Sequence, residues 1–315
     1  MPESLASLEV AVADVGDHGA TALAAALLES VNAAYTDALE DLTFSAEGEM
    51  KEKDSAGNET GRYRHHYRQN IADTPFEMTS RAKAKRLNHE LRGLAKPGTL
   101  PAAAEGCAFV VKDEARSDVL KVLISGPSDV HDVTRETPYG MGLFLFDFFC
   151  PAEYPEKAPV VNLMTTGDGL VRFNPNLYSD GKVCLSLIGT FNSGNSTEKW
   201  DPARSSIYQV LMGIQNQILE KYPIVNEPGY DGREDSKASR ELNAKLRLLT
   251  IRHAMVDQLK APPAGLEGAV LAHFRTQRRR ILRQCWAWTE EAPVELRGKM
   301  RAAVAQLHAV LPKAE

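Results

Sequence analysis

The chain has 315 residues, of which 43% are hydrophobic and 25% charged, enough to bury a core in one large domain or two modest ones. Its net charge of -5 argues against a protein built mainly to grip nucleic acid. The four cysteines are widely spaced, without CxxC pairs or Cys/His spacings. This argues against a zinc site and a disulfide-stapled secreted scaffold, and indicates a reducing compartment, the cytosol or nucleus.

The N-terminal zone, residues 1–46, is rich in alanine and shows helical periodicity. Its longest apolar stretch, residues 19–39, is interrupted by Glu29, Asn32 and Asp37. A membrane span needs about 18 uninterrupted apolar residues, so we expect an amphipathic helix and no membrane span.

A polar connector is expected over residues 47–76, because the run EGEMKEKDSAGNETG at 47–61 has the composition of a flexible segment. The next helix begins near Met78, and KPG at 96–98 ends it. Its apolar residues recur at steps of three and four: Ala84, Leu87, Leu91 and Leu94.

Four strands are predicted after this helix, because short aromatic or β-branched segments alternate with turn residues. The segments are CAFVV (107–111), VLKVLIS (119–125), LFLFDFF (143–149) and VVNLM (160–164). Short connections between consecutive strands favour an antiparallel meander.

Helices return after Trp200. One apolar face carries Ile207, Val210, Leu211, Ile214 and Ile218, and another carries Leu242, Leu246, Leu249, Met255, Val256 and Leu259. Two further helices are expected, over 266–290 and 293–311. The chain is therefore predicted to be an α+β protein, with a main domain over 77–260 and a C-terminal helical extension over 261–315.

The segment FNPNLYSDGKVCLSLI, residues 173–188, is the chemically suggestive part of the chain. Turn-rich segments within a regular fold often present functional groups. A folded-back turn can bring the Asn176 amide near the Cys184 thiol, which suits acyl transfer. Cys184 also lies between Val183 and Leu185, as a small buried hydrophobe would. The local residues leave both interpretations open.

The same segment resembles the active-site signature of ubiquitin-conjugating (E2) enzymes, an HPN tripeptide followed by GxxCL. The signature stands here as Asn174-Pro175-Asn176 and Gly181-Lys182-Val183-Cys184-Leu185. The closest resemblance is to the catalytic region of the giant members that carry BIR repeats, and it covers roughly residues 78–288. Further matching segments follow in the family's order: SGP (125–127), TPYGMGLFLFDFFCPAEYPEKAP (137–159), WDPA (200–203) and NEPGY (226–230).

The resemblance implies the ubiquitin-conjugating fold and a two-step relay. Cys184 receives ubiquitin or a related modifier from an activating enzyme (E1) as a thioester, then passes it to a substrate lysine or to a ligase (E3). Asn176 supports the active-site loop and the oxyanion. Glu227 is the candidate for a gating residue near the attacking lysine, with Asn226 second. No cofactor is expected, because the upstream E1 uses the ATP.

The resemblance also implies docking residues. On the basic helix these are contacts for an acidic E1, namely Arg81, Lys83, Lys85 and Arg86. Pro202 in WDPA is a further interface candidate. Glu156 stands where well-known members have a phenylalanine that docks ligases, which puts generic HECT-type pairing in doubt.

Three other departures from the family pattern concern the site itself. Asn174 replaces the usual histidine and is expected to be structural. Ser186 stands where many relatives carry an aspartate. An insertion over 189–199 is expected to be mobile beside the cysteine and to influence acceptor choice.

Alternative functions remain open at this stage. The main one is a catalytically inactive ubiquitin-binding adaptor of the same fold, although such a protein lacks the cysteine. A cysteine hydrolase would need a histidine base, and no histidine lies between His131 and His253. Nucleic-acid binding through RTQRRRILRQ (275–284) is not expected, because one short basic patch stands in an acidic chain. The tail is predicted to pack on its own domain and can also support a homodimer.

Overall fold

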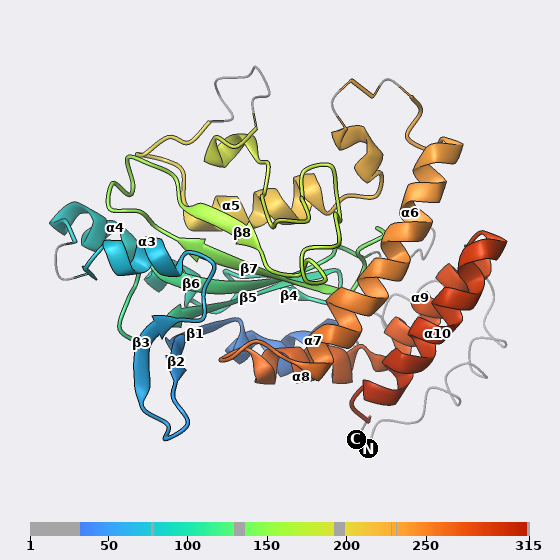
Figure 1. Ribbon diagram of the computed structural model, residues 1–315, viewed down its shortest axis with the longest axis horizontal. Helices are drawn as coiled ribbons and strands as arrows, with labels where there is room; N and C mark the ends of the chain where they lie inside the picture. Colours follow the sequence, from blue (N-terminus) through green and yellow to red (C-terminus); the bar gives the residue numbers. More distant parts are fainter. Residues whose placement is uncertain are drawn as a thin grey trace.

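A central six-stranded sheet organises the protein in its computed structural model, which describes residues 32–76, 79–128, 136–191, 199–227, 229–230 and 232–313 (Figure 1). The strand order is β1-β5-β6-β7-β8, and the short strand β4 (Ala102–Ala103) adds to β5. The four predicted strands are β5 (Gly106–Asp113), β6 (Val119–Ser125), β7 (Leu143–Phe149) and β8 (Val160–Leu163). Each pairs with the next in antiparallel register, so the predicted meander is confirmed.

The stretch expected to be a flexible connector has regular structure instead. Strand β1 (Phe44–Gly48) joins the edge of the sheet parallel to β5. It is followed by a hairpin of β2 (Lys51–Lys53) and β3 (Glu59–Tyr63) and by helix α3 (Arg68–Asp73).

Buried charges of the sheet hold this stretch in place. Asp147 accepts a hydrogen bond from the backbone N–H of His66 at 2.6 Å, and Arg116 donates to the carbonyl of Ile71 at 2.8 Å. Ile71 is itself buried. Residues 44–73 are therefore held in a regular structure by side chains more than 40 residues away, which the local composition cannot indicate.

Helices α4 (Arg81–Leu94) and α5 (Ile207–Gly213) cover one face of the sheet. Ser80 caps α4 by accepting from the backbone N–H of Lys83 at 3.1 Å, so the helix starts three residues after the predicted Met78, which lies outside the described residues. Ser206 and Gln209 form a capping box at the start of α5. The α5 rod continues as a π-helical segment, Ile214–Ile218.

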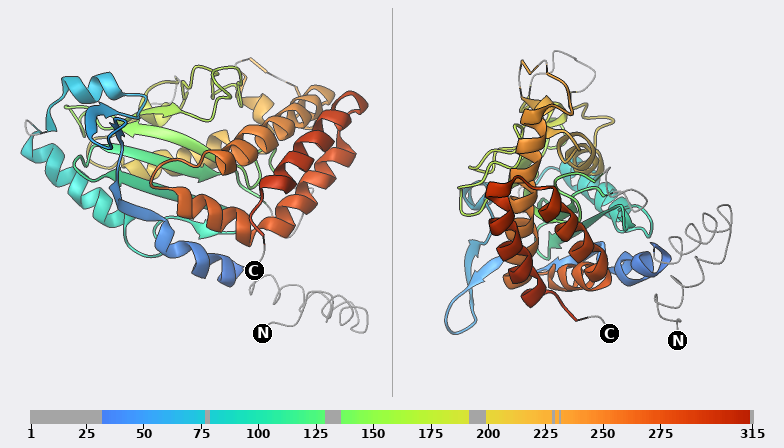
Figure 2. Two further views of the ribbon diagram at one scale, coloured as in Figure 1. Left: turned by 60° about the horizontal axis from the view of Figure 1, so that its bottom comes forward. Right: turned by 90° about the vertical axis from the view of Figure 1, so that its right-hand side faces the viewer.

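The C-terminal helices cover the opposite face (Figures 1 and 2). A long rod of α6 (Lys237–Leu249), a π-helical segment (Thr250–Val256) and α7 (Asp257–Lys260) leads to α8 (Glu267–Thr276), α9 (Arg278–Glu291) and α10 (Val294–Val310). The tail thus has three helices where two were expected, because the backbone at Gln277 leaves helical geometry and separates α8 from α9. Val270, Phe274 and Ile281 pack in one buried cluster with the sheet residues Phe109 and Val111, which confirms the predicted packing.

Alternation along the strands explains why both faces are apolar. In β5, Phe109 and Val111 face the tail cluster, while Ala108 and Val110 face the α4–α5 cluster. Strands covered on both sides read as continuous hydrophobic runs rather than alternating ones. The helix expected within 1–46 is present over residues 32–39, where Tyr35 and Leu39 join the tail cluster; residues 1–31 lie outside the described part.

Candidate active site

The cysteine segment folds back on itself as a short two-stranded ribbon. The backbone N–H of Cys184 donates to the carbonyl of Asn176 at 2.9 Å, and that of Tyr178 donates to the carbonyl of Lys182 at 3.0 Å. Between these pairs, Leu177 and Val183 form a bridge and point into the core. The ribbon therefore places Asn176 directly opposite Cys184, as the folded-back turn predicted.

Gly181 closes the ribbon in a conformation that needs glycine. Its φ is +89°, and a Cβ at this position would lie 2.2 Å from Nδ2 of Asn162 and 2.5 Å from the carbonyl oxygen of Leu163. The Gly181 carbonyl accepts a hydrogen bond from the backbone N–H of Leu163 at 2.8 Å and so joins the ribbon to β8. The cysteine is thereby fixed to the edge of the main sheet.

Cys184 differs from the other three cysteines in its access to solvent. Its side chain is 6% exposed, whereas Cys107, Cys150 and Cys285 are 0% exposed. Burial raises the pKa of Cys107 to about 11 and raises those of Cys150 and Cys285 as well. Because the thiolate is the nucleophile, these three sulfurs are held in an inert form.

Asn174 is the hydrogen-bonding centre of the site, which agrees with the structural role expected for it. Its Nδ2 donates to the carbonyl of Ile218 at 2.8 Å and to the hydroxyl of Tyr139 at 3.1 Å. Its Oδ1 accepts from the backbone N–H of Asn176 at 2.8 Å and from Nδ2 of Asn226 at 3.3 Å. One side chain thus joins the ribbon to the end of the α5 rod and to the segment around residue 226.

The three other site candidates are placed as follows. The side-chain amide of Asn176 has no hydrogen-bond partner among the described residues, so it is available beside the thiol. Asn226 reaches the site through Asn174. Glu227 is exposed and forms only a loose ion pair with Arg172, at 3.8 Å, so the second gating candidate contacts the site framework more directly than the first.

Glu220 is a carboxylate near the site that the sequence analysis did not single out. Burial raises its pKa, and the negative charge of Glu234 raises it further, while a hydrogen bond from Asn226 acts in the opposite direction. Its link to Asn226 adds a second polar group behind the gating segment. A single glutamate after an apolar helix gives no sequence signal for such a position.

Lys83 must be removed from the predicted docking set. It is fully buried, and its ammonium forms an ion pair with Asp118 at 2.6 Å, a carboxylate that Arg116 also binds. Position 83 lies on the inner side of α4, where its charge is compensated inside the fold. The helical periodicity alone did not reveal this, because the buried counter-ion comes from β6 and its preceding turn.

Arg86 also serves the fold. It forms an ion pair with Glu90 and donates to the carbonyls of Pro202, at 3.3 Å, and Ser205. It therefore braces the WDPA segment against α4, and the Pro202 candidate is half-buried beside it.

Arg81, Lys85 and Glu156 remain at the surface. All three side chains are exposed, so their sequence-based assignment to a docking surface is compatible with their positions.

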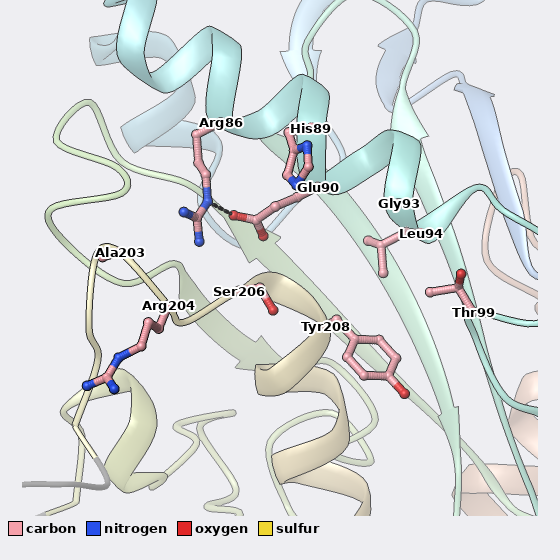
Figure 3. Close-up of a pocket in the computed structure, with 10 residues that line it drawn as sticks. All are labelled: Arg86, His89, Glu90, Gly93, Leu94, Thr99, Ala203, Arg204, Ser206 and Tyr208. Carbon is pink, nitrogen blue, oxygen red and sulfur yellow. Dashed lines mark hydrogen bonds and ion pairs between the residues drawn. The ribbon is translucent and has the colours of Figure 1, made fainter.

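Two hollows lie near these elements. One, of about 320 Å³, is lined by the α4 residues Arg86, His89 and Glu90 and by the residues around the start of α5 (Figure 3). The other, of about 680 Å³, is lined by residues 185–187, by Lys199 and by residues of α5. Cys184 is not among the lining residues of either hollow.

Trp200 ends the insertion that follows the cysteine. It is half-buried, donates from Nε1 to the carbonyl of Pro155 at 2.6 Å, and lies against Tyr154. Most of the insertion that was expected to be mobile, residues 192–198, lies outside the described residues.

Neither a membrane-spanning helix nor a metal cluster is found in the described ranges. None of the helices there is long and apolar enough to cross a bilayer. Nor do three or more His, Cys, Asp or Glu side chains come together there in a way that could hold a metal ion.

Comparison with known proteins assigns this α+β fold to a family. The family model described as "Ubiquitin-conjugating enzyme" matches residues 87–239. Residues 87–239 therefore form a domain of the ubiquitin-conjugating enzyme family, and this confirms the predicted fold class.

Two curated relatives with similar sequences are larger proteins. The chain is 38% identical over 266 residues to the human "Dual E2 ubiquitin-conjugating enzyme/E3 ubiquitin-protein ligase BIRC6", over 83% of this chain and 5% of that one. It is 43% identical over 169 residues to human "Ubiquitin-conjugating enzyme E2 Z", over 53% of this chain and 44% of that one. The solved structure of human E2 G1 aligns with a TM-score of 0.33 and 23% identity, over 44% of this chain and 94% of that one. The chain thus spans less than half the length of either curated relative.

Proposed function

We propose that the protein is an E2 ubiquitin-conjugating enzyme. Cys184 accepts ubiquitin or a related modifier from an activating enzyme as a thioester and transfers it to a lysine or to a ligase. The observation that carries the proposal is the ribbon, in which the one partly exposed cysteine of four lies opposite an unengaged asparagine amide. Membership of the family supports the same chemistry.

The residues have distinct roles in this reaction. The Cys184 thiolate attacks the activated carboxyl group of the modifier and later leaves as the acceptor amine takes its place. The Asn176 amide donates to the oxygen that becomes negatively charged during this exchange. Asn174 holds Asn176 in place through the backbone N–H.

The surroundings suggest where other groups act. Asn226, with Glu227 beside it, borders the site from the segment after the α5 rod and is suited to orient the acceptor lysine. Arg81 and Lys85 on α4 are suited to meet an acidic surface of the E1. Glu156 places a carboxylate on the neighbouring surface, so a ligase that docks here needs a polar or basic contact at that point.

A rival hydrolase mechanism is less well supported. A cysteine hydrolase uses a histidine to take up the thiol proton. Within the described part of the chain, no histidine hydrogen-bonds to Cys184, and the buried His65 and His273 are engaged elsewhere.

The proposal is tested by a charging reaction with E1, ATP and ubiquitin, analysed on a non-reducing gel. Wild-type protein should gain one modifier that a thiol reductant removes. Cys184→Ser should retain it as a reductant-resistant oxyester, and Cys184→Ala should gain none. Cys150→Ala is the matched control, because that sulfur is buried and should not be charged. Charging that persists in Cys184→Ala would refute the assignment.

A further inference from the structure

A lysine lies on the same side of the ribbon as the proposed nucleophile. Residues two apart in an extended segment point to the same face and lie about 7 Å apart along it. Val183 and Leu185 pack into the α4–α5 cluster, whereas Lys182 is exposed and Cys184, which is 6% exposed, is not part of that cluster. The Lys182 amine and the Cys184 thiol therefore project from the same face of one short strand.

The opposite strand of the ribbon completes this arrangement. Tyr178 is paired with Lys182, and Asn176 with Cys184, through the backbone hydrogen bonds at 3.0 and 2.9 Å. Paired residues of neighbouring strands share a face, so the tyrosine ring, the asparagine amide, the amine and the thiol all lie together. The inward partners, Leu177 and Val183, fix this register because a shift by one residue would expose them.

The lysine ammonium has a resting position away from the sulfur. Its Nζ lies 5.6 Å from the centre of the Tyr178 ring, which the Arg172 guanidinium also approaches at 4.4 Å. A cation–π contact at an exposed site is weak, and a lysine stem has four flexible carbons. The amine can therefore leave the ring and swing toward the neighbouring cysteine without any change in the backbone.

We propose that Lys182 is a self-modification site, which takes the modifier from Cys184 of the same molecule. This inference rests on the proposed function. The neutral ε-amine attacks the thioester carbonyl carbon, the new C–N bond forms and the C–S bond breaks. The sulfur leaves as a thiolate, and the proton released by the amine returns it to the thiol. The Asn176 amide lies on the same face and can stabilise the oxyanion of this transfer as it does for an external lysine.

The product would limit the enzyme. An isopeptide bond is not reversed by thiols, and a modifier attached two residues from Cys184 on the same face would cover the approach to the sulfur. In the absence of an acceptor, the charged enzyme would then remove itself from the active pool. The Tyr178 ring delays this outcome by holding the amine.

The test is a single-turnover reaction on the full chain. Wild-type protein is charged with E1, ATP and ubiquitin, ATP is removed, and a reductant-resistant adduct is followed on a gel and mapped by mass spectrometry. We expect a branch at Lys182, formed at a rate that does not change over a tenfold range of protein concentration. Lys182→Arg should charge normally and lose this adduct. Lys199→Arg should keep it, and it is the matched control because Lys199 lines the hollow beside the cysteine.

A mixing experiment separates transfer within one molecule from transfer between molecules. Charged Lys182→Arg protein is mixed with Cys184→Ala protein, which keeps the acceptor lysine but cannot be charged. Little or no adduct on the Cys184→Ala chain supports transfer within one molecule. An adduct formed there as fast as in the wild type, or branches only at other lysines, overturns the inference. Normal charging without a Lys182 branch overturns this inference alone, whereas no charging in any variant removes the proposed function as well.

Discussion

Removing the Asn174 side chain is the sharpest test of how the site is built. Asn174→Ala deletes four hydrogen bonds. Tyr139 keeps its bond to the carbonyl of Phe173, and half-buried Asn226 can turn to water. The buried Ile218 carbonyl loses its partner, which costs about 1–3 kcal/mol. The half-buried Asn176 N–H loses a hydrogen bond worth about 0.5–1.5 kcal/mol, so the free energy of unfolding should fall by about 1.5–4.5 kcal/mol in total.

Urea denaturation measures the loss of stability. Transfer of the modifier from the charged enzyme to free lysine, called discharge below, measures the loss of activity. Asn174→His should lose about half as much stability, because one imidazole offers only one donor and one acceptor. At a temperature where the alanine variant is folded by circular dichroism, discharge to lysine should still be impaired, since Asn176 is no longer held opposite the cysteine. An alanine variant within about 0.5 kcal/mol of wild type, or one with unchanged discharge, would refute this account of the site.

Three further predictions concern separate parts of the molecule. Asn176→Ala should slow discharge to lysine by about 10²–10³-fold and impair charging less, and equal damage to both steps would indicate misfolding instead. Trp288→Ala should cost about 3–5 kcal/mol of stability in urea denaturation and Trp286→Ala less than about 1, because their exposures are 1% and 49%; similar losses would contradict the tail packing. Burial lowers the pKa of His65 and His273 to about 4, below the usual value of about 6.5. As the pH falls, these two histidines therefore become protonated in the unfolded chain before they do so in the folded chain. The free energy of unfolding, measured against pH, should therefore fall as the pH drops from about 6.5 to about 4, and a flat curve would contradict it.

The regular part of the fold could be predicted because its signals are local. Aromatic and β-branched runs with short turns predicted β5 to β8 within a few residues, and apolar spacing indicated α4 and α5. Strand β1 escaped prediction because its burial pattern is mixed and its pairing with β5 spans more than 60 residues. The arginine-rich segment 275–284 gave no sign of its part in the fold. Arg280 is turned inward, where it donates to the carbonyl of Ala104 and to the hydroxyl of Ser128.

The candidate site could be predicted only as far as its residues are close in sequence. The spacing of Asn176 and Cys184 suggested a folded-back turn, and the ribbon has that form. The link from Asn174 to Asn226 joins positions 52 residues apart, so spacing could not reveal it. Lys83 looked like a surface charge for the same reason, because its partner Asp118 lies 35 residues away.

The proposed chemistry and the packing of the C-terminal tail lie on opposite faces of the sheet. Cys184 and its ribbon belong to the α4–α5 side, while the C-terminal helices pack on the opposite side. Both clusters share the strands, whose successive residues face opposite ways, and the α6 rod, which contributes Leu248 and Met255 to one cluster and Leu246 and Ala254 to the other. Loss of the tail would expose Phe109 and Val111, and it would act on the thiol by destabilising these shared elements. A tail variant should therefore lose charging in proportion to its folded fraction, whereas a ribbon variant such as Asn176→Ala should lose discharge while fully folded.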